Sequence, residues 1–297
     1  MKKIILLALL SLSLCGYLSE NKELGLYLKE NAPFEIYEPE ENPFKDLTEE
    51  ELQDMFTDTI DYPEDIEVEE NEELANSLPS SYDFRKTWKT CNPKVRDQLK
   101  CGSCWSFAGS TALAYRFCQK SKGKVKVTLS PQDSVSCDKA NRGCNGGSRL
   151  LTWKYYAQKG IVTDSCFPYS SGKGKVEKCI TKCKNGEKWK KYKAKNVKEI
   201  QGVTNIKNEL VNNGPVHASF LVYEDFMSYR GSIYIHVAGR ALGSHAIVIV
   251  GYGSQNGVNY WICQNSWGKT WAENGYFRIK MGECGINSNA VVGLPVL

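Results

Sequence analysis

The twelve cysteines are the strongest constraint on how this chain of 297 residues can fold. Cys15 ends an N-terminal stretch that begins with two lysines and continues as an apolar run over residues 4–14, the pattern of a secretory signal peptide. The run is too short to span a bilayer, and a buried N-terminal helix is the alternative interpretation. Export implies an oxidising compartment in which cysteines form disulfides. Removal of residues 1–16 leaves eleven cysteines, an odd number, so one must remain outside the intramolecular pairs.

Charge divides the rest of the chain into two parts. Residues 17–77 contain 21 Asp and Glu against 3 Lys, whereas residues 78–297 contain 33 Lys and Arg against 13 Asp and Glu. Because the composition changes at LPSSYDF, we place the boundary between an acidic segment and a basic body at Leu78. Net charges of −18 and +20 predict that the two parts attract each other.

The acidic segment contains one stretch with helical character. In ENPFKDLTEEELQDMF, apolar residues recur at roughly helical spacing, and Thr48 with Glu51 is a plausible capping box. Residues 61–77 have few core-forming side chains and predict an extended or disordered linker. An acidic spacer that only solubilises the chain is the alternative to a segment that binds the body.

The basic body changes from helical to strand-rich patterns along its length. WSFAGSTALAYRFCQK has apolar residues at helical spacing, and Ser103 is placed to cap this helix. Later, HAIVIVGYG and NYWICQNSWG are short apolar runs closed by glycine, which is typical of strands. This order predicts an α+β protein with two lobes. The lysine-dense stretch GKGKVEKCITKCKNGEKWKKYKAK is interpreted as a solvated loop held by disulfides, with a nucleic-acid patch as the alternative.

Cys101 and Cys104 in DQLKCGSCWSF are spaced as three kinds of site would require. A redox dithiol needs a compact βαβ unit around it, and this body is larger and holds nine other cysteines. Zinc needs a second pair at matching spacing, and the pair in CITKC lies in lysine-rich sequence. A nucleophilic cysteine needs a base and a residue that orients the base. His245 in GSHAIVIVGYG and Asn265 in NYWICQNSWG supply both, which favours a Cys–His–Asn site.

Several sequence blocks together resemble papain-like cysteine proteases, peptidase family C1. CGSCW, GSHAIVIVGYG and NSWGKTW correspond to the cysteine, histidine and asparagine blocks of the family, and LPSSYDFR, CNGG, NNGPV and ENGYF keep its order. The resemblance covers residues 78–297 and is strongest to the cathepsin B branch, in YEDFMSYRGSIYIHVAG and CGINSNAVVGLP. It implies a helical left lobe and a β-barrel-like right lobe with the active-site cleft between them.

The resemblance implies a role for each motif residue. Cys104 is the expected nucleophile at a helix N-terminus, His245 the base, and Asn265 the residue that orients the imidazole. Gln98 corresponds to the glutamine whose side-chain amide completes the oxyanion hole, and Trp267 to the indole that shields the His–Asn bond. A structural thiol at position 104 and a turn residue at position 98 are the alternatives.

Substrate contacts also follow from the resemblance. Gly146 and Gly147 correspond to the backbone beside the bound peptide, and Ala246 and Asn289 to positions in S2, the pocket for the P2 side chain. Cathepsin B has a glutamate where Asn289 stands, so we expect apolar or aromatic P2 residues. Arg149 lies close to the same pocket by alignment and further disfavours basic ones.

The resemblance implies a disulfide framework and a short loop. Only 12 residues separate Cys166 from Cys179, and none is a histidine, whereas the occluding loop of cathepsin B uses histidines to bind the substrate carboxylate. An open cleft and endopeptidase cleavage are therefore expected. Cys263 and Cys284 either pair or stay separate. The implied disulfides are Cys91–Cys118, Cys101–Cys144, Cys137–Cys179 and Cys166–Cys183.

The last expectations concern partners and location. The acidic segment is expected to be an inhibitory propeptide that is released in acid, because protonation weakens paired carboxylates. Protein and peptide substrates and cystatin-like inhibitors are the other partners of an expected monomer, without nucleic acid, membrane, metal or cofactor. The destination is the secretory pathway, ending in a lysosome or vacuole or outside the cell. A fold relative that binds peptides without cutting them is the rival function, and His217 and His236 are expected to be surface or lining residues.

Overall fold

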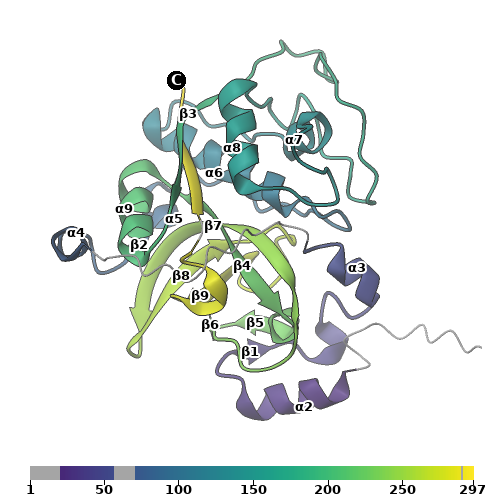
Figure 1. The fold of residues 1–297 in the computed structure, drawn as a ribbon, viewed down its shortest axis with the longest axis vertical. Helices are drawn as coiled ribbons and strands as arrows, with labels where there is room; N and C mark the ends of the chain where they lie inside the picture. The colour runs from purple at the N-terminus through teal and green to yellow at the C-terminus, as the bar shows by residue number, and fades with distance from the viewer. Residues whose placement is uncertain (1–20, 57–70, 289) are drawn as a thin grey trace, which may run out of the picture.

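The computed structural model describes residues 21–56, 71–288 and 290–297, so the predicted signal peptide and Asn289 lie outside the described residues. Figure 1 shows the body as two lobes, with helices in one and most of a mixed sheet in the other. This arrangement confirms the α+β, two-lobe prediction. The helices of the body are α5 (Phe84–Thr87), α6 (Cys104–Lys120), α7 (Pro131–Cys137), α8 (Arg149–Gln158) and α9 (Val203–Asn213).

Helix α6 is the centre of the helical lobe, and it is buried from Cys104 to Cys118. Small residues on its surface allow the neighbouring helix to approach closely, since a Cβ at Gly109 would lie 2.9 Å from Thr152 of α8. Ser103 occupies the N-cap position as predicted, but its side chain makes no capping hydrogen bond. Its hydroxyl lies 3.0 Å from the Tyr169 hydroxyl instead, so the capping interaction itself was predicted wrongly.

The large sheet has the strand order β3-β10-β4-β7-β8-β9-β6, with β2 paired to β7. Strands β4 and β7 are antiparallel, and their register places Ser219 opposite Ala246 and Phe220 opposite His245. Because side chains alternate along a strand, Phe220 enters the core of the sheet lobe while Ala246 packs with the helical lobe. The strands of this sheet are β2 (Tyr82–Asp83), β3 (Ala194–Ile200), β4 (Val216–Tyr223), β6 (Ile233–Tyr234), β7 (Ala241–Gln255), β8 (Val258–Gln264), β9 (Tyr276–Lys280) and β10 (Ala290–Pro295).

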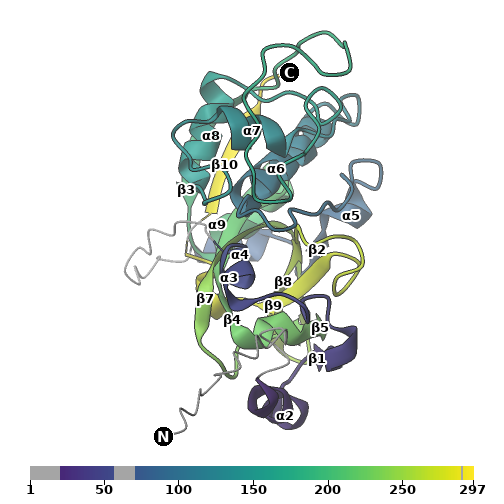
Figure 2. The same ribbon diagram turned by 90° about the vertical axis from the view of Figure 1, so that its right-hand side faces the viewer.

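The acidic segment runs along the sheet lobe toward the helical lobe (Figure 2). Its strand β1 (Glu35–Ile36) pairs antiparallel with β5 (Tyr229–Gly231) of the body. The predicted capping box is confirmed, because the Glu51 N–H donates to Thr48 Oγ1 at 3.2 Å and the Thr48 N–H donates to Glu51 Oε2 at 3.3 Å. The other elements of the segment are α2 (Lys22–Asn31), the 3₁₀ helix η1 (Pro39–Glu41), α3 (Glu49–Gln53) and α4 (Glu72–Ser77).

Helix α4 corrects the prediction of an extended or disordered linker over residues 61–77. Part of that range, residues 61–70, lies outside the described residues, but Glu72–Ser77 is helical. Asn71 caps the helix by accepting the Leu74 N–H at 2.9 Å, and Glu72 and Glu73 lie in the first turn, where the helix dipole favours acidic side chains. Local capping therefore forms a turn of helix without a buried face.

All four disulfides of the structure lie in the part of the chain that builds the helical lobe. Cys263 is buried and Cys284 half-buried, and the described coordinates place neither in a disulfide. No helix in the described ranges is both long and apolar enough to cross a membrane. The bonded pairs are the four implied by the resemblance, Cys91–Cys118, Cys101–Cys144, Cys137–Cys179 and Cys166–Cys183.

Candidate active site

Cys104 is the first residue of α6, at the end of the helix where backbone N–H groups and the helix dipole favour negative charge. Its side chain is buried, and Cys104 belongs to none of the four disulfides. The disulfide between Cys101 and Cys144 fixes the loop before it, and the Gly102 N–H donates to the Cys144 carbonyl at 2.9 Å. Cys104 packs in the same buried cluster as Ala246, the residue that follows His245.

His245 is held by a residue from the neighbouring part of the sheet lobe. Its Nε2 lies 2.7 Å from Asn265 Oδ1, and that oxygen also accepts the Ser266 N–H at 2.7 Å. The Trp267 indole covers the pair, with 4.7 Å between its ring centroid and that of the imidazole. Because Asn265 is hydrogen-bonded to Nε2, the nitrogen that remains to face a thiol is Nδ1. The Nδ1 atom is buried and makes no hydrogen bond within the described ranges.

The side-chain amide of Gln98 is fixed from both ends. Its Nε2 donates to the Cys101 carbonyl at 3.1 Å, and its Oε1 accepts the Ser266 hydroxyl at 2.6 Å. The Tyr169 hydroxyl donates to the Gln98 carbonyl at 2.8 Å, which holds the backbone as well. The amide orientation is therefore set by contacts on three sides, as an oxyanion donor requires.

Sequence reasoning missed Ser266 and Tyr169. Ser266 directly follows Asn265 in the NSWG block, so its proximity to the site could have been expected from the sequence. Tyr169 lies in the short loop between Cys166 and Cys179, and nothing in its local sequence connects it with Gln98.

Gly146 and Gly147 form a close wall beside the nucleophile. Gly146 has φ +97°, a left-handed conformation that strains other residues, and a Cβ at Gly147 would lie 2.6 Å from the Trp105 ring. Trp105 directly follows Cys104, so the wall is pressed against the start of α6. Ala246 is buried opposite Ser219, while Asn289, the other predicted S2 residue, lies outside the described residues.

The acidic segment covers the predicted catalytic residues. The Met55 carbonyl accepts a hydrogen bond from Gln98 Nε2 at 3.4 Å. The Phe56 ring meets the His245 imidazole edge to face at 5.9 Å between centroids, and Phe44 meets Trp267 in the same way at 5.1 Å. A peptide carbonyl of the segment thus already approaches the candidate oxyanion donor.

Burial beneath these rings changes the charge state of the site. His245 is fully buried, and burial lowers its pKa to about 4, although the hydrogen bond to Asn265 acts in the opposite direction. An unperturbed imidazole titrates at about 6.5. The covered histidine therefore stays neutral over most of the acidic range, and a neutral imidazole cannot stabilise a thiolate as an imidazolium would.

The other two histidines differ from each other. His217 is buried in the core, where its Nδ1 accepts the Trp153 indole N–H at 3.2 Å, so its prediction as a surface or lining residue is wrong. His236 is half-buried, with its Nδ1 3.0 Å from Asp225 Oδ2 and its ring stacked on Tyr223. Neither makes its hydrogen bonds to the residues predicted to be catalytic.

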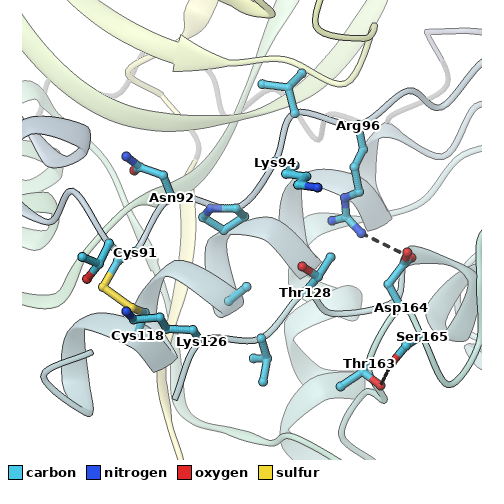
Figure 3. Close-up of a pocket in the computed structure, with 15 residues that line it drawn as sticks. Cys91, Asn92, Lys94, Arg96, Cys118, Lys126, Thr128, Thr163, Asp164 and Ser165 are labelled. Carbon is cyan, nitrogen blue, oxygen red and sulfur yellow. Dashed lines mark hydrogen bonds and ion pairs between the residues drawn. A yellow bond between two sulfur atoms is a disulfide. The ribbon is translucent and has the colours of Figure 1, made fainter. Parts of the chain in front are cut away.

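A separate hollow of about 750 Å³ lies along the later turns of α6 (Figure 3). It is lined by Ala114 and Cys118 of that helix and contains the ion pair between Arg96 and Asp164, whose nearest charged atoms are 3.6 Å apart. None of the residues predicted to be catalytic lines it. The described ranges also contain no group of three or more acidic, histidine or cysteine side chains arranged to hold a metal ion.

Comparisons with known proteins agree with this geometry. The family described as papain family cysteine protease matches residues 78–294. Cathepsin B-like CP3 of Giardia intestinalis is 42% identical over 225 residues, covering 74% of this chain and 75% of its own length. Cathepsin B-like cysteine proteinase 4 of Caenorhabditis elegans is 36% identical over 295 residues, covering 84% and 86%.

Solved proforms have the same fold with the N-terminal segment included. ProCathepsin B S9 from Trypanosoma congolense superposes with a TM-score of 0.81 at 28% identity, covering 93% of this chain and 97% of its own. Digestive procathepsin L2 from the larval midgut of Tenebrio molitor superposes with a TM-score of 0.74 at 26% identity, covering 93% and 89%. These proforms indicate that the acidic segment is an intramolecular partner of the body.

Proposed function

Because the chain belongs to the papain family of cysteine proteases, we propose that it is an endopeptidase made as a zymogen, with Cys104, His245, Asn265 and Gln98 as its site. The observation that supports this most directly is the hydrogen bond from the Gln98 amide to the Met55 carbonyl, 3.4 Å long, beside the His245–Asn265 pair. A donor fixed by the protein is already directed at a peptide carbonyl. A substrate carbonyl would take that place once the segment leaves.

The proposed reaction proceeds by covalent catalysis. Cys104 Sγ attacks the carbonyl carbon and forms a thioester, while the peptide C–N bond breaks and the amine leaves with a proton from His245 Nδ1. His245 then takes a proton from water, whose oxygen attacks the thioester; the C–S bond breaks, the new carboxylic acid leaves, and the thiolate regains its proton from His245. Asn265 holds the imidazole throughout, and the Gln98 amide stabilises the oxyanion of each tetrahedral intermediate.

We propose that the segment before Leu78 is the inhibitory propeptide and that its removal produces the active enzyme. The segment inserts apolar side chains beside the site, and the match to the family begins at residue 78. The pattern of residues 1–16 supports entry into the secretory pathway, with a lysosome, a vacuole or the outside of the cell as the destination. Cystatin-like inhibitors remain a proposed class of partner.

Endopeptidase cleavage is proposed because the loop between Cys166 and Cys179 is held on one wall of the site. The Lys100 N–H donates to the Gly172 carbonyl at 3.0 Å, and the Ser170 N–H donates to Gln132 Oε1 at 2.8 Å. Without a histidine, this loop lacks the groups that bind a substrate carboxylate in cathepsin B. Rapid sequential release of C-terminal dipeptides from unblocked peptides would contradict this part of the proposal.

Labelling with an epoxide inhibitor of cysteine proteases tests the function. The processed protein should be alkylated at Cys104 and should cleave internal bonds of a blocked peptide, whereas Cys104→Ser should do neither. Cys263→Ser is the matched control, because that thiol is buried in the sheet core and should not affect labelling. Peptide binding without alkylation or cleavage would favour the non-catalytic relative, and insulin reduction would favour a redox dithiol.

A further inference from the structure

Arg149 is placed where a structural arginine is unfavourable. It is the first residue of α8, the helix end at which the dipole disfavours a cation, and only 3% of it is exposed. Burial of a guanidinium also costs solvation free energy. Ser148 caps the helix by accepting the Leu151 N–H at 3.4 Å, so the helix does not need a charged residue at this position to begin.

The position of Arg149 links it to segments that also carry predicted catalytic residues. The Gly147 wall, two residues earlier, is pressed against Trp105, the residue after Cys104. At its other end the guanidinium donates a hydrogen bond to Ser219 Oγ. Ser219 lies opposite Ala246, the residue after His245, in the β4–β7 pairing. The cation therefore lies between the glycine wall and the strand that carries the histidine, where the family resemblance places S2.

The surroundings are suited to an anion that accepts hydrogen bonds. Ser244 shares its strand face with Ala246, and its hydroxyl is buried without a hydrogen-bond partner in the described ranges. His217, two residues before Ser219 on the same face of β4, is uncharged over the usual pH range, because burial and then the charge of Arg149 lower its pKa well below the usual value. Of these neighbouring side chains, Arg149 is therefore the cationic one in the predicted S2 region.

We propose that Arg149 makes this pocket selective for an acidic P2 residue, glutamate or aspartate, whose carboxylate accepts charge-assisted hydrogen bonds from the guanidinium. The inference rests on the proposed peptidase function and replaces the expectation of apolar or aromatic P2 residues. The Ser219 hydroxyl fixes the guanidinium before substrate arrives, so little side-chain entropy is lost on binding. The Ser244 hydroxyl is a second donor on the same face.

The test compares blocked fluorogenic peptides that differ only at P2, which is glutamate, glutamine, leucine or arginine. With processed enzyme at about pH 6, where a glutamate is ionised, kcat/KM for glutamate should exceed that for the isosteric glutamine by about tenfold or more. Arginine should be the poorest. The advantage of glutamate should shrink as pH falls through about 4.3, since its carboxylate then becomes neutral. Glutamine or leucine cleaved as well as glutamate at about pH 6 would overturn the inference.

Variants separate charge from packing. Arg149→Gln should abolish the preference of glutamate over glutamine while Cys104 is still alkylated, and Arg149→Lys should retain part of it. Arg142→Gln is the matched control, because Arg142 is an exposed arginine of the segment that precedes α8, and the preference should stay unchanged. If Arg149→Gln does not fold, the ratio measured with the unaltered enzyme still decides. Failure of every peptide and of Cys104 labelling would refute the proposed function, whereas efficient cleavage of the peptide with leucine at P2 but not of the one with glutamate would refute only the inference.

Discussion

At the scale of single residues, the site depends on side chains whose orientation is fixed by hydrogen bonds, in addition to their being near one another. Gln98 shows this most clearly, because Cys101, Ser266 and Tyr169 each hold a different part of it. An amide that must reorient during the reaction would lose much of its benefit, since preorganised donors stabilise the developing charge without rearrangement. Substitutions that leave Gln98 in place but release it should therefore lower the rate.

Removal of the amide gives the first prediction. Gln98→Ala should lower kcat by about 10²–10³-fold, because one oxyanion donor is lost. Ser266→Ala should lower kcat by less, with KM nearly unchanged, since the amide remains but loses one contact. Single-turnover acylation of an ester substrate measures both. Equal rates for Gln98→Ala and the unaltered enzyme would show that this amide does not contact the oxyanion.

The second prediction concerns His245. Burial lowers its pKa to about 4, and Phe56 of the segment is one of the rings that bury it, so uncovering the imidazole should raise the pKa toward the ordinary value of about 6.5. Imidazole NMR signals of Cys104→Ser, followed against pH before and after propeptide removal, measure the change. The same titration midpoint for His245 in both forms would contradict this account.

At the scale of elements, helix α3 and the residues after it make the contact with the predicted catalytic residues. Leu52 is fully buried and belongs to the core of the sheet lobe together with Met55 and Phe56. The charge pairs nearby, Glu51 with Lys100 and Glu49 with Arg240, are at or near the surface, where ion pairs contribute little. Within the described part of the segment, we therefore expect these apolar side chains to contribute more to docking than the charge pairs of α3.

The third prediction follows from this comparison. Leu52→Ala should weaken propeptide docking by about 2–5 kcal/mol, the usual cost of removing a buried leucine side chain, and should produce activity without processing. Glu49→Gln should change docking much less. Inhibition of the processed enzyme by the corresponding synthetic segment, measured as a Ki, separates the two. Should Glu49→Gln prove as damaging as Leu52→Ala, the charge pairs would be the main contact after all.

At the scale of the whole molecule, acid should loosen the propeptide through two groups that titrate in different ranges. The pKa of His245 is about 4 in the covered form, and we expect it to lie nearer 6.5 once uncovered, so protonation should favour uncovering as pH falls from about 6.5 toward 4. The pKa of Glu51 is lowered chiefly by its hydrogen bond to Lys100. Its contribution to docking is therefore present above the free carboxyl value of about 4.3 and is lost as pH falls below it.

The fourth prediction is a two-part pH profile for release of the propeptide. In Cys104→Ser, which cannot process itself, the dissociation rate should rise as pH falls from about 6.5 and rise further below about 4.3. Glu51→Gln should remove only the lower part, and Thr48→Gln, at the neighbouring exposed cap, is the control for disturbing α3. A rate that is constant from about pH 6.5 to 4.3 would exclude His245 as a trigger, and a rate that does not rise further below about 4.3 would exclude Glu51.

The extent to which the sequence predicts this structure depends on whether the signal is local. Cys104, His245 and Asn265 lie in short blocks with characteristic neighbours, and Thr48 with Glu51 is a signal confined to one turn, so these could be read directly. The contact of Met55 with Gln98 joins residues 43 apart and leaves no pattern in either stretch.

Competition between partners explains other differences. Ser103 has a residue type suited to capping, but Tyr169 takes its hydroxyl, and a tertiary contact of this kind cannot be anticipated from helix-start rules. His217 was expected near the surface because isolated histidines usually lie there, yet the Trp153 indole gives it a buried donor. The charge of Arg149 was visible in the sequence, but its burial beside Ser219 was not.

All four disulfides lie within residues 91–183, so the two walls of the substrate site differ in their resistance to reduction. A reducing medium would break these disulfides and loosen the helical lobe, which carries Cys104. The sheet lobe, which carries His245 and is held by its aromatic core, would stay intact. Activity would then be lost because Cys104 moves away from His245, at a reductant concentration lower than the one that unfolds the whole chain.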